Sequence, residues 1–244
     1  MSHGALPLLL GLAALLTLAA TGCESTQDKS ARLARESGGI ATQQGVTVTK
    51  SNRDVRVLGT SVVTDANGTA VVVRLRNASS RPQADVPVAL DVRDAAGTTV
   101  FTNATPGLER SLTHAALVPA RGDAVWVNDQ VFASEPPKRA SAKVGAPEGD
   151  PPADAAAIRV GRVRLTEDPV SGLAATGAVT NPGSEDQRRV LLTAVATEGD
   201  RVVAAGRGVI PRVRAGKRSR FRIFFIGDPK GAELTVTAAP GPTG

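Results

Sequence analysis

Residues 86–93 have the sequence Val-Pro-Val-Ala-Leu-Asp-Val-Arg, in which every second side chain is apolar. Successive side chains of a β-strand point to opposite faces of the sheet, so a period of two predicts a strand with one face in an apolar core. Residues 190–196, Val-Leu-Leu-Thr-Ala-Val-Ala, repeat this alternation. The two stretches together predict an all-β fold.

Similar short runs of valine, leucine and threonine fill most of the chain after Val46. Turn residues separate them, as in Asp65-Ala-Asn-Gly68 and Asp94-Ala-Ala-Gly97, because Asn and Gly tolerate positive φ angles. No helical period is sustained after residue 46. The expected strands are 46–49, 55–58, 70–76, 86–93, 100–102, 124–127, 158–165, 174–180, 190–196, 201–205, 220–226 and 234–237.

The β-rich region contains two similar halves, which predicts an internal repeat. Asn77 and Asn181 each end a strand and precede a polar loop of the same length, which leads to Val86 and Val190. About seven short strands in each half of roughly 90–100 residues are typical of an immunoglobulin-like sandwich. The other matched pairs are Arg121-Gly122 with Ala215-Gly216 and Pro137-Lys138 with Pro229-Lys230.

The second half has the order strand, Asn, polar loop, alternating strand, Gly-bearing hairpin, and then Gly-x-x-x-x-Phe-x-x-x-Phe. The residues in this order are Asn181, Val190, Leu192, Gly216, Phe221 and Phe225. The arrangement resembles the FxLYD-type domains of bacterial envelope proteins. That resemblance implies immunoglobulin-like modules, which in this family are often lipid-anchored, and it assigns no binding residue.

An uncharged apolar run occupies residues 5–22, and its most apolar part is Leu8 to Leu18. This part is too short to span a bilayer comfortably, because a spanning helix needs ~20 apolar residues. An apolar core followed by small residues is typical of a secretory signal. Cys23, the only cysteine of the chain, comes directly after these small residues.

Residues 20–23, Ala-Thr-Gly-Cys, resemble the lipobox of bacterial lipoproteins. The resemblance implies cleavage between Gly22 and Cys23, diacylation (palmitate-type) of the Cys23 sulfur, and membrane lipid as a partner. The alternatives are a plain signal peptide, with Cys23 a free thiol, and an uncleaved membrane anchor. A lone free thiol is unusual in an oxidising compartment, and two acyl chains anchor a protein durably, so lipidation is favoured.

The stretch Gly145-Ala-Pro-Glu-Gly-Asp-Pro-Pro-Ala-Asp154 interrupts the strand pattern, because its prolines and glycines support neither strand nor helix. We therefore expect two tandem immunoglobulin-like β-sandwiches after a signal peptide and a flexible tether. The expected segments are a lipoprotein signal peptide at 1–22, a tether at 23–45, a first sandwich at 46–144, a linker at 145–157 and a second sandwich at 158–240.

The amino-acid composition limits which residues can form the cores and which kinds of partner the protein can bind. Tyrosine is absent and Trp126 is the single tryptophan, so the cores must be built mainly from Val, Leu, Ile and Ala. The net charge of +6 can favour contact with anionic lipid heads or wall polymers, and the alternative is an ordinary solvated surface. Export to the outer face of the cytoplasmic membrane, or to the outer membrane, argues against nucleic acid.

Residues for catalysis are sparse after Cys23. His114 is the only histidine there, which excludes ordinary His/Cys metal clusters and Cys–His catalysis. No Gly-x-Ser-x-Gly motif is present, and His114 is expected at a surface or half-buried strand position. The acidic pairs Glu167-Asp168 and Glu185-Asp186 lack the spacing of a calcium loop. We expect no enzyme activity, no cofactor and no metal.

A basic stripe is the best candidate binding surface in the sequence, and the alternative is an edge or surface strand that its charge protects from aggregation. On a strand its last three arginines share one face, and Phe221, Ile223 and Phe225 share the other. The hypothesis is a lipid-anchored envelope protein whose non-catalytic modules bind an envelope protein, a glycan or an anionic polymer. The alternatives are an accessory subunit of a membrane complex for secretion or transport, a metal-binding protein, and an enzyme. The stripe comprises Arg212, Arg214, Lys217, Arg218, Arg220 and Arg222.

Overall fold

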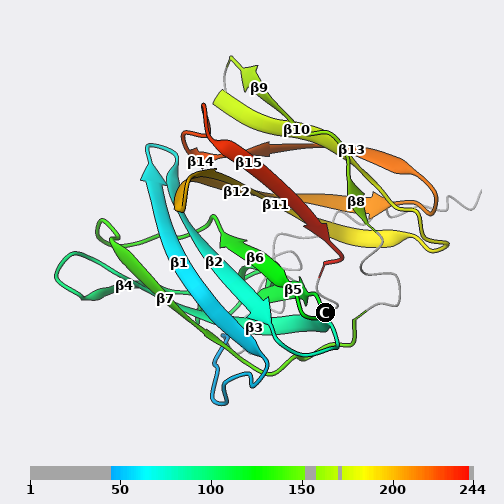
Figure 1. The fold of residues 1–244 in the computed structure, drawn as a ribbon. Coiled ribbons are helices and arrows are strands. Elements are labelled where there is room, and N and C mark those ends of the chain that lie inside the picture. Colours follow the sequence, from blue (N-terminus) through cyan, green and yellow to red (C-terminus); the bar gives the residue numbers. More distant parts are fainter. Residues whose placement is uncertain (1–44, 152–157, 170–171, 242–244) are drawn as a thin grey trace, which may run out of the picture. The chain divides into compact units, whose positions relative to one another are not determined.

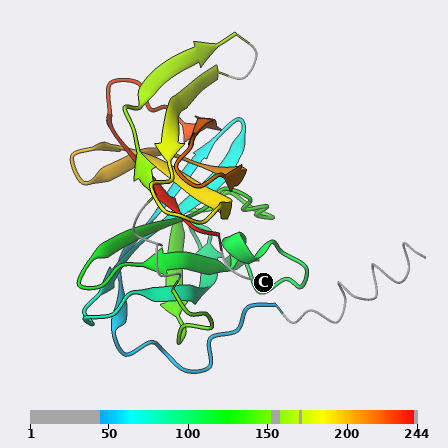
Figure 2. The same ribbon diagram turned by 90° about the vertical axis from the view of Figure 1, so that its right-hand side faces the viewer.

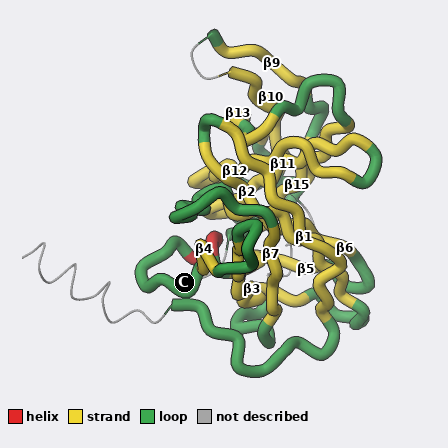
Figure 3. The backbone as a smooth tube through the Cα atoms, turned by 90° about the vertical axis from the view of Figure 1, so that its left-hand side faces the viewer, coloured by secondary structure: helices red, strands yellow, loops and turns green. Residues whose placement is uncertain are grey.

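A computed structural model describes residues 45–151, 158–169 and 172–241. These residues are almost entirely strand and loop, with one short 3-10 helix, so the predicted all-β class is confirmed (Figure 3). The predicted signal peptide at 1–22, which ends at Gly22, and nearly all of the predicted tether, which begins at Cys23, lie outside the described residues.

The strands are named β1 to β15 and the 3-10 helix η1 in chain order (Figure 1). Their bounds are β1 Val55–Asp65, β2 Gly68–Asn77, β3 Gln83–Arg93, β4 Thr99–Thr102, η1 Arg110–Leu112, β5 His114–Val118, β6 Asp123–Asn128, β7 Arg139–Val144, β8 Arg159–Val160, β9 Arg164–Asp168, β10 Gly172–Thr180, β11 Gln187–Glu198, β12 Arg201–Val213, β13 Arg218–Phe224, β14 Ile226–Gly227 and β15 Glu233–Ala239.

The strands form four antiparallel sheets. Before the linker, one sheet has the order β1-β2-β6, and the other has the order β4-β3-β5 with β7 also paired to β3. After the linker, one sheet has the order β13-β10-β8 with β9 also on β10, and the other has the order β14-β12-β11-β15. Among the described residues, no strand before the linker pairs with a strand after it, and Figure 2 shows the two groups.

Each group buries an apolar core between its two sheets, as the alternating patterns predict. In the first group, Val71, Val73 and Leu75 of β2 pack in one cluster with the alternating residues 86, 88, 90 and 92 of β3. In the second, Val190 and Leu192 of β11 share a cluster with residues of β10 and β13. Both groups therefore have the two-layer design of a β-sandwich.

A third apolar cluster joins the two groups. Ala70 and Val72 on the opposite face of β2, with Val127 of β6, pack against Val195 of β11 and Ala205 of β12. β2 is thus buried on both faces, which explains why residues 70–73 are continuously apolar rather than alternating. The tip of the β1–β2 hairpin reaches the second group, where the Gly227 N–H donates to Asp65 Oδ2 at 2.8 Å.

The same local structure recurs at the two matched asparagines, which are both fully buried. The Asn77 side-chain amide donates to the carbonyls of Arg81 and Val118, and its oxygen accepts from the Ser79 N–H. Asn181 makes the same three bonds with Glu185, Val213 and Gly183. Each asparagine therefore fastens its polar loop to a strand of the facing sheet.

Backbone strain recurs at matched places too. Asp85 (φ 52°) and Arg189 (φ 49°) both have positive φ, and each is the residue left unpaired in an otherwise unbroken register, directly before the alternating strand begins. A second pair, Arg121 (φ 49°) and Gly216 (φ 64°), lies in the turn before β6 and β13. Gly216 therefore corresponds to Arg121 and not, as the sequence comparison predicted, to Gly122.

The two groups differ most between β4 and β5. In the second group the corresponding strand, β12, is continuous, whereas residues 103–113 separate β4 from β5 and contain η1. Asn103 and Trp126 hold the insertion in place. The Asn103 side-chain amide donates to the carbonyls of Val88 and Leu112, and the Trp126 indole N–H donates to Ser111 O at 3.0 Å. This insertion is the feature that distinguishes the first group.

Three expected strands were wrong in detail. The expected strand at 220–226 is divided into β13 and β14, which belong to different sheets. Residues 46–49 form no strand, although Ser51 makes an isolated bridge to Gly145. The expected strand at 158–165 is divided into β8 and β9, because the chain between them shifts its register against β10.

Candidate functional site

The structure divides the predicted basic stripe between two sheets. Arg212 belongs to β12, and Arg214 and Lys217 lie in the turn between β12 and β13, where the Lys217 N–H donates to Arg214 O at 3.0 Å. The remaining three residues, Arg218, Arg220 and Arg222, are exposed along β13 and alternate with buried Phe221 and Ile223. Only these three share a face.

The three β13 arginines flank a strand with small outward side chains. In the antiparallel pairing, Arg218, Arg220 and Arg222 lie opposite Thr180, Ala178 and Thr176 of β10. The other residues of β10, such as Ala175 and Val179, belong to the core. The outward side chains of β10 are therefore much shorter than the arginines of β13 beside them, so this face of β10 lies lower than the row of arginines.

A second row of arginines lies on the other side of β10. Arg159 of β8 is opposite Thr180, and Arg164 of β9 is opposite Thr176. Arg162, between the two strands, is also exposed. The sequence prediction missed these residues because they lie more than fifty positions before β13 (Arg218 minus Arg164 is 54) and only strand pairing brings them near.

The two rows enclose a groove of about 910 Å³, which we call the arginine groove. Thr176, Gly177 and Ala178 form its floor. The arginines that line it are Arg162 and Arg164 on one wall and Arg218, Arg220 and Arg222 on the other.

Two acidic residues, Glu167 and Asp168, also line the groove. Asp168 accepts a hydrogen bond from Arg222 at 3.2 Å. Among the described residues, Arg162, Arg164, Arg218 and Arg220 make no ion pair. The groove therefore keeps a net positive charge and can bind anions.

Arg212, the first residue of the predicted stripe, pairs with an acidic residue that does not line the groove. Its guanidinium forms an ion pair with Asp186, whose other carboxylate oxygen accepts from the Ala215 N–H at 2.8 Å. This backbone N–H, together with Arg212, lowers the pKa of Asp186. Asp186 therefore fixes the β12–β13 turn, and Arg212 contributes to this turn rather than to the groove.

His114 lies in a polar cluster under the insertion of the first group. It is 6% exposed at the start of β5, so it is buried rather than at the predicted surface or half-buried position. Its Nε2 lies 3.2 Å from Glu148, and Arg110 of η1 binds both Glu148 and the buried carboxylate of Asp85. Burial first, and then the charge of Arg110, lower the pKa of His114.

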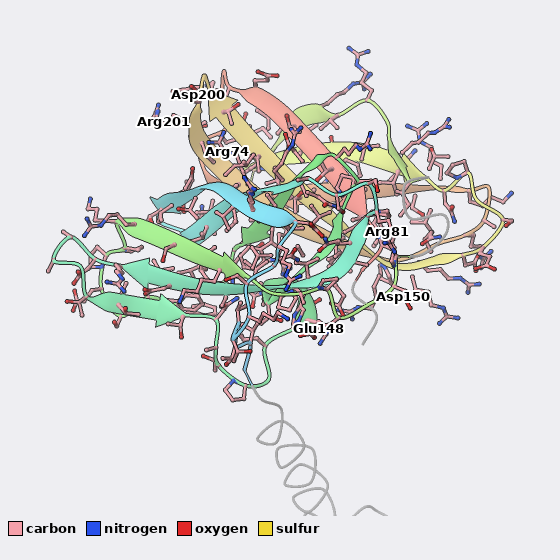
Figure 4. All side chains as sticks on the ribbon, turned by 60° about the horizontal axis from the view of Figure 1, so that its bottom comes forward. Arg74, Arg81, Glu148, Asp150, Asp200 and Arg201 are labelled. Carbon is pink, nitrogen blue, oxygen red and sulfur yellow. The ribbon has the colours of Figure 1, made fainter. Side chains whose placement is uncertain are left out.

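Thr113, His114 and Glu148 have the order of a hydroxyl–imidazole–carboxylate relay. The Thr113 hydroxyl lies 2.8 Å from His114 Nδ1, but it also donates to Arg110 O at 3.0 Å. With its proton used in this way and its side chain buried, Thr113 is not placed as a nucleophile. The cluster joins Asp85 of β3, the insertion and the segment after β7, where Glu148 lies (Figure 4).

Glu148 belongs to the stretch that was predicted to be a plain linker. The start of this stretch is bound to the first group, since Ala84 makes an isolated bridge to Gly149 and the Glu148 N–H donates to Asp85 O. No sequence signal marked Glu148, because its partners come from three separate elements.

A second concave site lies where the two groups meet. It encloses about 390 Å³ and is mainly apolar, with side chains such as Leu117, Val125 and Leu191 in its lining. Arg207, also in the lining, is only 9% exposed, and it binds Asp129 at 2.9 Å and the Ser111 hydroxyl at 2.8 Å. Its charge is therefore already compensated.

Within the part of the chain that the structure describes, no helix is long and apolar enough to cross a membrane. The same residues contain no group of three or more His, Cys, Asp or Glu side chains that could hold a metal ion. The predicted lipidation and cleavage residues, Cys23 and Gly22, lie outside the described residues.

Comparison with known proteins places no constraint on these sites. No family model matches the chain, and no curated protein matches it.

Proposed function

We propose that this chain is a lipid-anchored protein of the bacterial cell envelope, held by Cys23, whose two β-sandwich groups present a non-catalytic binding surface to an envelope partner. The single observation that carries the proposal is the arginine groove. It is an exposed, positively charged concavity on a β-sheet, and four of its arginines have no ion-pair partner among the described residues.

Anchoring is proposed from the sequence of residues 5–23, an apolar run that ends in Ala-Thr-Gly-Cys. The protein would then be exported and fixed by lipid to the outer face of the cytoplasmic membrane or to the outer membrane. A tandem pair of immunoglobulin-like modules agrees with the recurring asparagine bonds, and the third apolar cluster would hold the modules in one orientation.

A binding role agrees better with the structure than chemistry does. Thr113, the hydroxyl nearest to His114, already donates to Arg110 O, and the junction site contains a charge that is already compensated. Rigid sheets with exposed charged side chains are suited to recognition, because the partner meets a surface that needs no reorganisation.

One observation favours a second candidate, an accessory subunit of a membrane complex. Phe132, in the loop after β6, is 82% exposed although its neighbour Val131 is buried. An exposed aromatic side chain on a fixed loop is the kind of anchor that protein interfaces use.

The experiment is crosslinking in living bacteria followed by affinity capture, with the wild-type chain, Cys23→Ala and a triple Arg218→Glu, Arg220→Glu, Arg222→Glu variant. The proposal expects captured envelope polymer or protein in the wild type and its loss in both variants. Equal capture by all three chains would contradict it. A capture that depends on Phe132 but not on the arginines would favour the accessory role.

A further inference from the structure

The arginine groove has two walls and a low floor, and this shape restricts what can fill it. Along β13 the arginines are two residues apart, so their Cβ atoms are separated by about 6.8 Å, twice the rise of an antiparallel strand. The two walls belong to the strands on either side of β10, so they are about 9.6 Å apart.

The cations therefore form two parallel rows rather than one cluster. A cluster would suit a single compact anion. Two rows on either side of β10, of which the β13 row is regularly spaced, suit an elongated ligand whose negative charges repeat along its length, with the ligand lying along β10 and contacting both walls. A flat membrane surface would reach the arginine ends but would not enter the groove.

The floor gives further information on the ligand. Ala178 is 2% exposed and Thr176 is half-buried, so backbone and small side chains close the groove between the arginines. Among the described residues that line it, Phe221 is the only aromatic one, and it is 8% exposed and packs into the core. Nucleic-acid bases would find no stacking surface there, and such stacking is the usual source of affinity for single strands.

We propose that the arginine groove binds a linear polyanion without aromatic bases, of the phosphodiester-linked or polyphosphate type. The polymer lies along β10 between the arginines of β8–β9 and those of β13. This inference deepens the proposed function by naming the chemistry of the partner. Its biological setting rests on that function, whereas binding itself requires only the groove.

The test measures binding of labelled linear inorganic polyphosphate to the purified full chain, kept in detergent, over a range of salt concentrations. The wild type is expected to bind, with log K falling against log salt with a slope of about −3, since each of four unpaired arginines contributes roughly −0.7. Orthophosphate in excess by phosphorus should compete poorly, because one anion cannot contact both rows.

Two charge-reversal variants test the groove, and a third variant serves as their control. Charge reversal of the β13 wall, Arg218/Arg220/Arg222→Glu, or of the opposite wall together with the nearby Arg159 of β8, Arg159/Arg162/Arg164→Glu, is expected to weaken binding by at least roughly tenfold. Reversal of three exposed cations of the first group, Lys138/Arg139/Lys143→Glu, makes the same change in net charge and is expected to leave most of the affinity. Far-UV circular dichroism checks that each variant is folded.

Thr176→Trp tests the shape without changing the charge. A bulky side chain on the floor is expected to block polyphosphate and to leave binding to vesicles of anionic and zwitterionic phospholipid unchanged. Equal polyphosphate binding by Thr176→Trp, or full binding by either wall variant, would overturn the proposal. So would vesicle binding in the absence of polyphosphate binding.

The labelling of Cys23 and the polyphosphate measurement distinguish a failure of the proposed anchor from a failure of the groove assignment. If Cys23 is not acylated but polyphosphate binds as described, the groove assignment holds and the anchor does not. If Cys23 is acylated and polyphosphate does not bind, the anchor holds and the groove assignment is wrong.

Discussion

Asn77 and Asn181 are the buried polar side chains that connect the two sheets of each group. Replacement of either residue by Ala removes two donated bonds and one bond accepted from a backbone N–H, and at Asn77 it also removes the bond accepted from the Ser79 hydroxyl. The unfolding free energy is expected to fall by about 2–4 kcal/mol, since buried carbonyls are left without a donor. Urea denaturation measures this change. Asn→Asp should be no better than Ala, because a carboxylate faces the same carbonyls, and a neutral effect of Asn→Asp would contradict the role.

His114 is expected to make stability depend on pH. Because its pKa is lowered in the folded chain, the unfolded chain takes up a proton near pH ~6.5 and the folded chain only at lower pH. Stability is therefore full above this range and falls as pH drops below ~6.5, with a slope of at most about 1.4 kcal/mol per pH unit.

The check on His114 compares urea midpoints between pH 7 and pH 5 for the wild type and His114→Gln. The variant should lose most of the slope in this window. A slope equal to that of the wild type would assign the pH dependence in this window to groups other than His114. Glu148 does not contribute there, because its lowered pKa places its titration below the ordinary value of 4.5.

At the scale of elements, β12 and β13 approach so closely that glycine is required. A Cβ at Gly206 would lie 2.0 Å from Phe224 O, a backbone atom, whereas one at Gly208 would lie 3.0 Å from a side-chain atom of Ile223. Gly206→Ala is therefore expected to destabilise the protein by more than about 2 kcal/mol, and Gly208→Ala by about 1 kcal/mol. Thermal unfolding of the two variants compares them directly, and an equal or reversed order would contradict the close packing of these strands.

Strand positions could be predicted from the sequence wherever one face is buried, as in β3 and β11, because alternation records that face. The pattern could not show that β2 has two buried faces, since the second face depends on strands more than a hundred residues later. For the same reason, only one of the two walls of the arginine groove could be predicted. Arg218, Arg220 and Arg222 are close in sequence, whereas the opposite wall depends on pairing through β10.

At the scale of the whole molecule, the third apolar cluster is expected to make the two groups unfold together. Val72 belongs to this cluster and to neither sandwich core, so Val72→Asp places a charge between the groups while leaving each core intact. Trp126, the only tryptophan, reports on the first group, and circular dichroism reports on both.

In the wild type the fluorescence and circular dichroism transitions should coincide, and in Val72→Asp they should separate. Val195→Thr provides a milder change on the opposite side of the same cluster. Coincident transitions in Val72→Asp, with unchanged stability, would show that the cluster does not couple the two groups.

The proposed function in the cell envelope depends on the protein being held there through Cys23. The most direct measurement is metabolic labelling of bacteria with a clickable fatty acid, followed by membrane fractionation of the wild-type chain and Cys23→Ala. The predicted result is a labelled wild-type chain in the membrane fraction and an unlabelled, released Cys23→Ala chain. An unlabelled wild-type chain, or equal labelling of both chains, would contradict it.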